Sequence, residues 1–164
     1  MDDYQQLLTE LAGQEERLQF SEFANETALQ LGLKLVERAK AEGKAVTVDI
    51  CRNGQQLFHF ALAGTSADND AWIRRKNNVV NRYGLSSYHV GTRFRAKGRP
   101  FDESSRLDPD EYAAHGGAFP ITVRDVGVVG TVTVSGLPEV EDHEFVVRVL
   151  GEFLSAPRGA ASKG

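Results

Sequence analysis

A helical segment with unusual polar residues carries the first side chains that could bind a ligand. Within residues 69–83, Arg74, Asn77, Asn78 and Asn81 recur at spacings of three and four, along one stripe of a helix. Asparagine is a poor helix former, and a merely solvated helix face usually carries Glu, Lys and Gln instead. The stripe therefore indicates amide and guanidinium groups that bind a ligand or a partner subunit, with a solvated face as the alternative.

Two further cations, Arg75 and Lys76, lie on the same segment. Lys76 shares its helical turn with Trp72, so we expect its ammonium group at the boundary of the core. There it would pair with a carboxylate of the protein or with an acid group of a ligand. Local positive charge of this kind suits a small anionic ligand.

A glycine pair beside a histidine, His115-Gly116-Gly117, is the second candidate segment. Two glycines let the backbone approach a ligand closely or turn through positive φ. The histidine is a candidate general acid or base, although a lone loop histidine is more often an ordinary surface residue. We expect this loop and the cations of residues 75 and 76 to converge on one cavity.

The third candidate segment is a strand that ends at Ser135-Gly136 and leads into a helix. Free backbone N–H groups at such a helix start can hold an anion. His115, Asp142 and His143 are weak candidates for metal ligands, but their spacing matches no dedicated metal motif, so no metal is assigned. Ser135 with Asp142 and His143 is not taken as a triad, because neighbouring side chains on a helix diverge by about 100°.

Composition and charge exclude several classes of protein. The net charge of −4, from 23 acidic and 19 basic residues, does not suit a nucleic-acid or membrane-surface binder. The single cysteine, Cys51, lies in an apolar run where a buried, inert thiol is expected. No apolar run is long enough to span a bilayer, and the acidic N-terminus does not resemble a signal peptide. We therefore expect a cytoplasmic protein without nucleic-acid or membrane partners.

Hydrophobic periodicity predicts the elements that position these segments. Spacings of three and four predict helices over 4–16, from a cap at Ser21 to Gly43, over 69–83 after a cap at Asp68, and over 139–154. Alternation and apolar runs predict strands over 45–51, 55–62, 119–123 and 128–134, the first two joined by a hairpin turn at Asn53-Gly54. Residues 87–93 fit a further strand, and Asp108-Pro109 fits the start of one helical turn.

This order of elements predicts an α/β fold of the α+β type, with helices that flank an antiparallel sheet. No linker or internal repeat interrupts residues 1–154, so we expect a single domain there. The small, polar residues of 155–164 predict a disordered tail.

Several motifs resemble the GlcG/HbpS-like superfamily, also called the haem-degrading domain. They are Gly116-Gly117-x-x-Pro120-Ile121, Gly127-Val128-Val129-Gly130, Val134-Ser135-Gly136 and the later Asp142. The sequence resembles the branch known as uncharacterised protein family 0303 more closely, over about residues 7–154. The motifs that resemble it are Gly64-Thr65, Asp68-Asn69-x-x-Trp72-Ile73-x-Arg75-Lys76, Ser86-Ser87, His115-Gly116-Gly117 and Ser135-Gly136-Leu137-Pro138 with Asp142-His143.

The resemblance implies a profilin-like or PAS-like fold and symmetric homo-oligomers. Because some relatives bind haem or promote its breakdown, it also makes haem a candidate cofactor, with the natural one left open. Lys76 falls where the wider family has a helix lysine. The following Asn77-Asn78-Val79-Val80 departs from the family's run of small residues, and these bulkier side chains would reshape the same pocket wall.

Three functions fit these observations. The first is an oligomeric binding protein for haem, another anionic tetrapyrrole or a small anionic metabolite. Its ligand-binding residues would be Arg75, Lys76, Asn78, His115, Gly116, Gly117, Ser135 and Gly136. The second is an enzyme acting on a small anionic substrate, with His115 or His143 as general acid or base and Lys76 stabilising negative charge. The third is an assembly or chaperone-partner scaffold that uses the polar stripe as its interface and holds no small ligand.

Overall fold

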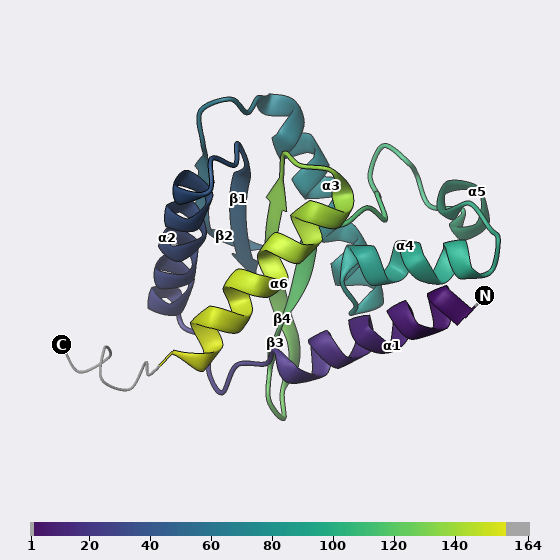
Figure 1. The fold of residues 1–164 in the computed structure, drawn as a ribbon, viewed down its shortest axis with the longest axis horizontal. Helices are drawn as coiled ribbons and strands as arrows, with labels where there is room; N and C mark the ends of the chain where they lie inside the picture. The colour runs from purple at the N-terminus through teal and green to yellow at the C-terminus, as the bar shows by residue number, and fades with distance from the viewer. Residues whose placement is uncertain (1, 157–164) are drawn as a thin grey trace.

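A computed structural model describes residues 2–156 of the chain, so most of the predicted tail, 157–164, lies outside it. The described residues form one four-stranded antiparallel sheet in the order β2-β1-β4-β3 (Figure 1). The strands are β1 (Thr47–Arg52), β2 (Gln55–Ala61), β3 (Ala118–Val123) and β4 (Gly127–Ser135). The helices are α1 (Asp2–Arg17), α2 (Asn25–Ala41), α3 (Ala67–Tyr83), α4 (Ser87–Ala96), α5 (Phe101–Ser105) and α6 (Glu139–Ser155). The predicted α+β class is confirmed.

The hairpin between β1 and β2 turns where the sequence predicts it. Asn53 and Gly54 both have positive φ, 49° and 83°, as a two-residue hairpin turn of type I′ requires. The pairing is irregular between Ile50 and Cys51, and beyond this bulge Asp49 lies opposite His59. Since a bulge re-aims side chains, it places these two polar groups together on one face of the sheet.

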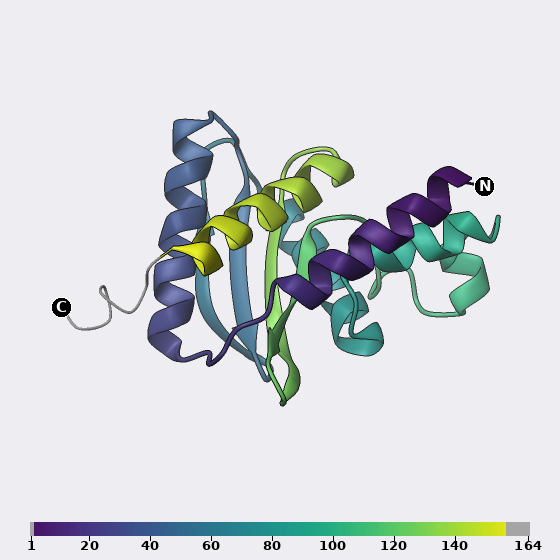
Figure 2. The same cartoon turned by 60° about the horizontal axis from the view of Figure 1, so that its bottom comes forward.

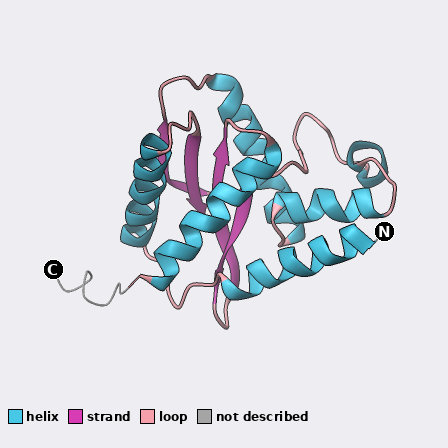
Figure 3. Cartoon of the chain, viewed as in Figure 1, coloured by secondary structure: helices cyan, strands magenta, loops and turns pink. Residues whose placement is uncertain are grey.

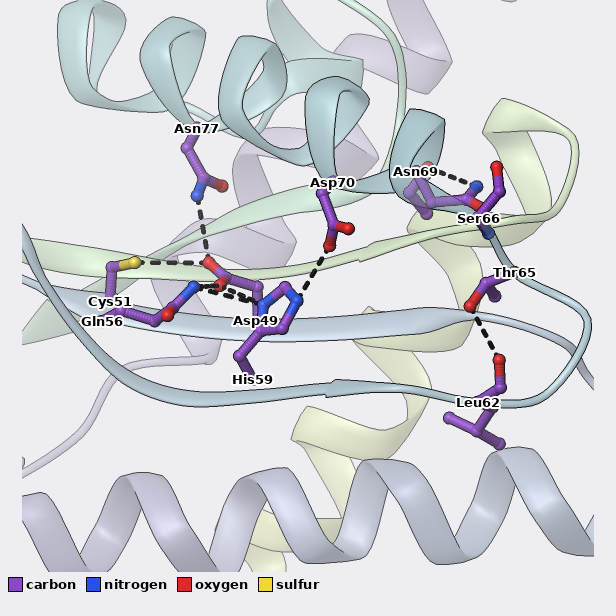
Figure 4. A network of polar contacts seen from close by, with 11 residues as sticks. Asp49, Cys51, Gln56, His59, Leu62, Thr65, Ser66, Asn69, Asp70 and Asn77 are labelled. Atoms are coloured by element: carbon purple, nitrogen blue, oxygen red, sulfur yellow. Dashed lines mark hydrogen bonds and ion pairs between the residues drawn. The ribbon is translucent and has the colours of Figure 1, made fainter.

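The two faces of the sheet differ in chemistry. Helices α2 and α6 cover one face (Figures 1 and 2), and there the main core forms from fully buried residues that include Val48, Ile50, Val132, Val134, Leu35 and Leu150. The alternate strand residues, among them Asp49, Thr131 and Thr133, point to the other face, because side chains alternate along a strand. Helix α3 packs on that polar face, as Figure 4 shows with α3 on the opposite side of the strands from α2.

A smaller apolar cluster joins α3, α4 and α5 to the body of the domain. It contains the buried Val79, Val90 and Ala114, with Tyr83, Phe94 and Phe101 packed around them. Helix α1 lies alongside α4 (Figure 2), where Glu15 accepts a hydrogen bond from the backbone N–H of Ser86 at 2.8 Å and contacts His89 at 2.9 Å. These contacts hold the start of α4 against α1.

The segment 87–93 is a helix, so its interpretation as a strand was wrong. Figure 3 shows α4 and α5 as helices at one end of the molecule. Ser86 caps α4, because its hydroxyl oxygen accepts a hydrogen bond from the backbone N–H of His89 at 3.1 Å. The short helix α5 lies in a stretch for which the sequence predicted none, before the turn that Asp108 begins.

Two predicted helix starts are displaced by a few residues. Helix α3 begins after Ser66, whose backbone N–H donates to Asn69 Oδ1 at 3.0 Å, rather than after Asp68. Helix α2 begins at Asn25, with the backbone N–H of Ala24 donating to Thr27 Oγ1 at 3.1 Å, rather than next to Ser21. Within residues 2–156, no helix has the length and apolarity that a bilayer crossing requires.

Candidate ligand-binding site

Polar residues of helix α3 line two hollows, and different residues of the helix line each one. The α3 groove has a volume of about 920 Å³ and is lined mainly by Asp49, Gln56, His59, Asp70, Arg74, Asn77, Asn78, Asn81, Val128, Val129 and Thr131. The Lys76 pocket has a volume of about 270 Å³ and is lined by Asp68, Asn69, Trp72, Lys76, His115, Ser135, Gly136, Leu137, Glu139 and Asp142.

The polar stripe predicted from the sequence faces the α3 groove. All four of its members, Arg74, Asn77, Asn78 and Asn81, line that hollow. Asn77 is fixed against the sheet, because its amide nitrogen donates to Asp49 Oδ2 at 3.2 Å and its oxygen accepts from the hydroxyl of Thr133. The stripe is therefore part of a built wall and not a helix face turned wholly to bulk water.

His59 bridges two carboxylates at the wall of the groove (Figure 4). Its Nδ1 lies 2.9 Å from Asp49 Oδ1, and its Nε2 lies 2.8 Å from Asp70 Oδ1. Because an ionised carboxylate can only accept, both contacts are hydrogen bonds only when both ring nitrogens carry a proton. The bridge joins β1, β2 and α3, so it ties the start of α3 to the sheet.

Asp49 is a buried carboxylate with several partners. Its side chain is 2% exposed, and it accepts hydrogen bonds from Gln56 Nε2 at 2.7 Å and from the Cys51 thiol at 3.3 Å, in addition to Asn77 and His59. Burial, and then the charge of Asp49, raise the pKa of the Cys51 thiol to about 12. Cys51 is half-buried and lines the α3 groove, so the expectation of a buried thiol was wrong, although the raised pKa disfavours the nucleophilic thiolate at neutral pH.

A buried ion pair is part of the lining of the Lys76 pocket. Lys76 is 3% exposed, and its Nζ lies 3.2 Å from Asp142 Oδ2 and 3.4 Å from the carbonyl oxygen of Val134. The backbone N–H of Leu137 donates to the other oxygen of Asp142 at 3.0 Å. Burial lowers the pKa of Lys76 and raises the pKa of Asp142 to about 6, since it disfavours both charged forms.

Gly117 makes room for the Lys76 ammonium group. A Cβ atom at this position would lie 2.7 Å from Lys76 Nζ and 2.4 Å from the carbonyl oxygen of Val134. Its φ of +138° is also a conformation that favours glycine. The second glycine of the loop has the positive φ that the sequence suggested, and the group it approaches closely is the lysine.

Polar contacts form the mouth of the Lys76 pocket. His115 Nδ1 lies 3.2 Å from Glu139 Oε2, and the His115 ring packs edge-on against Trp72 with 5.3 Å between ring centroids. The hydrogen bond from His115 lowers the pKa of Glu139. Asn69 Nδ2 donates to the Ser135 hydroxyl oxygen at 3.3 Å, which joins the start of α3 to the end of β4.

The structure brings together several of the predicted site residues. Lys76, His115, Ser135 and Gly136 line one pocket with Asp142, and Gly117 lies against Lys76 from behind. Gly116 is in the same loop, with its backbone N–H donating to Glu139 Oε1 at 3.3 Å. The expected convergence of the glycine loop with the third helix is thus present for Lys76.

Three predicted residues lie apart from this pocket. Arg75 stacks on Trp72, 4.4 Å from its ring centroid, and its Nε donates to the carbonyl oxygen of Pro109 at 3.0 Å. Asn78 lines the α3 groove instead, with its amide nitrogen donating to the carbonyl oxygen of Glu111. His143 is 2% exposed and lines neither hollow, and its Nε2 contacts Gln14 Oε1 at 2.9 Å.

The candidate metal ligands do not assemble around one point. Asp142 is engaged by Lys76, His143 by Gln14 and His115 by Glu139. In the part of the chain that the structure describes, no three His, Cys, Asp or Glu side chains are grouped as a metal ion would require.

Sequence reasoning missed the groove residues Asp49, Gln56 and His59. The signal available was weak: Asp49 and His59 are polar residues in otherwise apolar strand segments, a pattern that indicates one polar sheet face. Their pairing depends on the bulge after Ile50, which the sequence does not reveal.

Comparison with known proteins identifies the family to which this chain belongs. A family model described as "Haem degrading protein HbpS-like" matches residues 23–150. The chain belongs to the HbpS-like family. It is 62% identical over 147 residues to a UPF0303 protein of Streptomyces coelicolor, with 90% of this chain and 93% of that protein covered.

Solved structures share the HbpS-like architecture. The crystal structure of the Ybr137w protein superposes with a TM-score of 0.83 at 35% identity, over 89% of this chain and 86% of that one. A crystal structure described as a PduOC:heme complex superposes with a TM-score of 0.66 at 17% identity, over 79% of this chain and 93% of that one. At that identity the second match shows the fold alone.

Proposed function

We propose that this HbpS-like protein binds a small ligand, haem or another anionic tetrapyrrole, in the α3 groove. The observation that carries the proposal is the groove itself. Its volume of about 920 Å³ lies at the upper end of ligand pockets, and the Lys76 pocket, at about 270 Å³, is too small for a macrocycle. The family description names haem degradation, and the PduOC relative was crystallised with haem.

The groove offers the groups that such a ligand needs. Val128 and Val129 supply an apolar wall for a macrocycle, and the exposed Arg74 supplies a guanidinium group that can hold a carboxylate through two hydrogen bonds. His59 is the histidine that lines the groove, and it would have to leave Asp70 or Asp49 before it could ligate iron. Bound haem would supply redox chemistry, whereas the protein's own residues bind and orient it.

A haem titration tests this proposal with two neighbouring arginines. Arg74 lines the groove, whereas Arg75 stacks on Trp72 outside it, so Arg75→Ala is a matched control for Arg74→Ala. We expect haem binding to give a saturable Soret shift. The dissociation constant for haem should rise about tenfold in Arg74→Ala, because one charge-assisted contact is lost. Arg75→Ala should bind like the wild type.

A filling variant tests the location independently. Asn81 is exposed at the edge of the groove, so Asn81→Trp should occlude the hollow without disturbing the core, and should abolish the Soret shift. The proposal fails if no saturable shift occurs, or if Arg74→Ala and Asn81→Trp bind haem as the wild type does.

A further inference from the structure

Lys76 is a buried amine that ends in a hollow, and tetrapyrrole binding in the α3 groove gives it no role. It is 3% exposed, yet it lines the Lys76 pocket together with Asn69, Ser135 and His115. A lysine used only as a solvated surface charge would not be buried in the lining of a cavity. Amines in such positions form Schiff bases with carbonyl compounds in many proteins.

We propose that Lys76 forms an imine with a small, uncharged hydroxyaldehyde bound in the Lys76 pocket. The proposal concerns a different hollow from the α3 groove and does not rest on tetrapyrrole binding. It stands on the position of Nζ, 3.2 Å from Asp142 Oδ2, on a lysine that lines a hollow of about 270 Å³.

Asp142 is positioned to accept the proton that the amine must lose. The two groups are 3.2 Å apart, and backbone N–H donation from Leu137 fixes the carboxylate at the start of α6. Burial lowers the pKa of Lys76 and raises the pKa of Asp142 to about 6. It therefore narrows the gap between the two pKa values, the gap that opposes proton transfer from the amine to the carboxylate. Transfer of the proton from Lys76 to Asp142 would leave a neutral amine beside a protonated acid.

The reaction conserves atoms and electrons without another reagent. The neutral Lys76 amine attacks the aldehyde carbon, a C–N bond forms, and the carbonyl oxygen takes a proton from Asp142 to give a carbinolamine. Loss of the hydroxyl group as water, with a proton supplied from the amine side, then leaves a C=N bond. Nothing is oxidised or reduced, and the protonated imine keeps the positive charge that Asp142 already neutralises.

The pocket's charge and polar groups define the class of carbonyl compound. Its lining holds the carboxylates of Asp68, Glu139 and Asp142 against Lys76 and His115, and Arg95 adds a positive charge 3.9 Å from Glu139. This excess of negative charge disfavours a 2-oxo acid, because its own carboxylate would be repelled. Asn69 and Ser135 offer hydrogen-bonding groups to hydroxyls, so a hydroxyaldehyde matches the lining better.

Borohydride trapping with peptide mapping tests the proposal on the wild-type protein. The probe is glycolaldehyde, reduced in place with sodium borohydride, and the control residue is the exposed Lys97. We expect Lys76 to be modified saturably and roughly tenfold more than Lys97, because its neutral amine fraction is larger. Denaturation in urea before labelling should remove this preference.

Two comparisons make the test decisive. Glyoxylate, which carries a carboxylate, should label Lys76 several-fold less than glycolaldehyde; equal labelling would overturn the assignment to uncharged aldehydes. Lys76→Arg keeps the cation beside Asp142 but cannot form the imine, so only that peptide should lose its label. If Lys97 and the other exposed lysines react while Lys76 of the folded protein does not, the imine proposal is wrong.

Discussion

Asp49 and Asp142 are two buried carboxylates that contact neighbouring residues of helix α3, Asn77 and Lys76, and they are stabilised in different ways. Asp49 receives hydrogen bonds from four side chains, including His59 and Asn77, beside an open groove. Asp142 has one charged partner, Lys76, and the backbone N–H groups at the start of α6. The Asp49 carboxylate is stabilised by several side-chain donors, whereas the Asp142 carboxylate combines one cation with backbone donors.

This difference decides how each region responds to change. When one partner of Asp49 is removed, the others remain and water from the groove can replace the missing donor. When Lys76 is removed, Asp142, whose side chain is 2% exposed, loses its cationic partner, which is the costly outcome for a buried pair. The Lys76 pocket is therefore the sensitive region, and the α3 groove is the tolerant one.

Lys76→Met gives the largest expected effect. It should lower the free energy of unfolding at pH 7.5 by about 3–5 kcal/mol, because it strands the Asp142 charge. Urea denaturation measures this. The pKa of Asp142 is already raised to about 6, and losing Lys76 raises it further, so the deficit should shrink as the pH falls and the carboxyl protonates.

The double variant Lys76→Met/Asp142→Asn is the control for that experiment. Its amide oxygen can still accept from the N–H of Leu137, and no charge is left behind, so most of the lost stability should return. A single variant that loses less than about 1 kcal/mol would show that the pair is no more sensitive than an exposed one.

His143, next to Asp142, gives the second largest effect, and only in acid. Burial, and then the charge of His89, lower the pKa of His143 to about 4 from 6.5. The unfolded chain therefore takes up a proton on this residue below pH 6.5 while the folded protein does not, and stability is lost as the pH falls from 6.5 to 4. From pH 7 to pH 5 this loss is about 2 kcal/mol.

His143→Gln should remove that loss. Between pH 7 and pH 5, the variant should lose about 2 kcal/mol less of its folding stability than the wild type loses. Asp142 acts in the opposite direction, because its raised pKa favours the folded state in acid, but it is present in both proteins and cancels from the comparison. Equal pH dependence in the two proteins would contradict the assignment to His143.

In the α3 groove, the tolerant region, we expect His59→Gln to have a smaller effect on stability. We expect a loss of about 1 kcal/mol, because Gln56, Asn77 and Cys51 still donate to Asp49. His115→Gln is the matched control. It makes the same exchange at a half-exposed histidine in the mouth of the Lys76 pocket, so it controls for the loss of a histidine as such. A loss in His59→Gln as large as that in Lys76→Met would erase the distinction between the two regions.

The sequence predicted the sensitive region better than the tolerant one, for a physical reason. Lys76 and the glycine loop are local patterns: helical spacing puts the lysine at the core boundary, and a glycine pair marks a close approach. The groove depends on strand register. A two-residue turn at Asn53-Gly54 without a bulge would place Asp49 opposite Phe58, and the bulge after Ile50 replaces it with His59.

Helix α4 was misassigned for a related reason. Residues 87–93 contain alternating apolar side chains that fit a strand, and the propensity of a short segment does not distinguish the two states. The contacts that decide are distant: Glu15 of α1 binds Ser86 and His89, and Gly91 lies so close to the backbone of Ala114 that a Cβ would come within 2.2 Å of its carbonyl oxygen. Tertiary packing of this kind overrides the local pattern.

The smallest effect is expected at the outer end of the His59 bridge. The side chain of Asp70 is 46% exposed, so its contact with His59 at 2.8 Å competes with water and should add no more than about 0.5 kcal/mol. Asp70→Asn should therefore hardly change the urea midpoint, and the change should vanish in high salt. In a double-mutant cycle with His59→Gln, the coupling energy should be a small part of what Lys76 and Asp142 show. A coupling of several kcal/mol would mean that Asp70 is integral to the stability of Asp49, and that the groove is as rigidly built as the pocket.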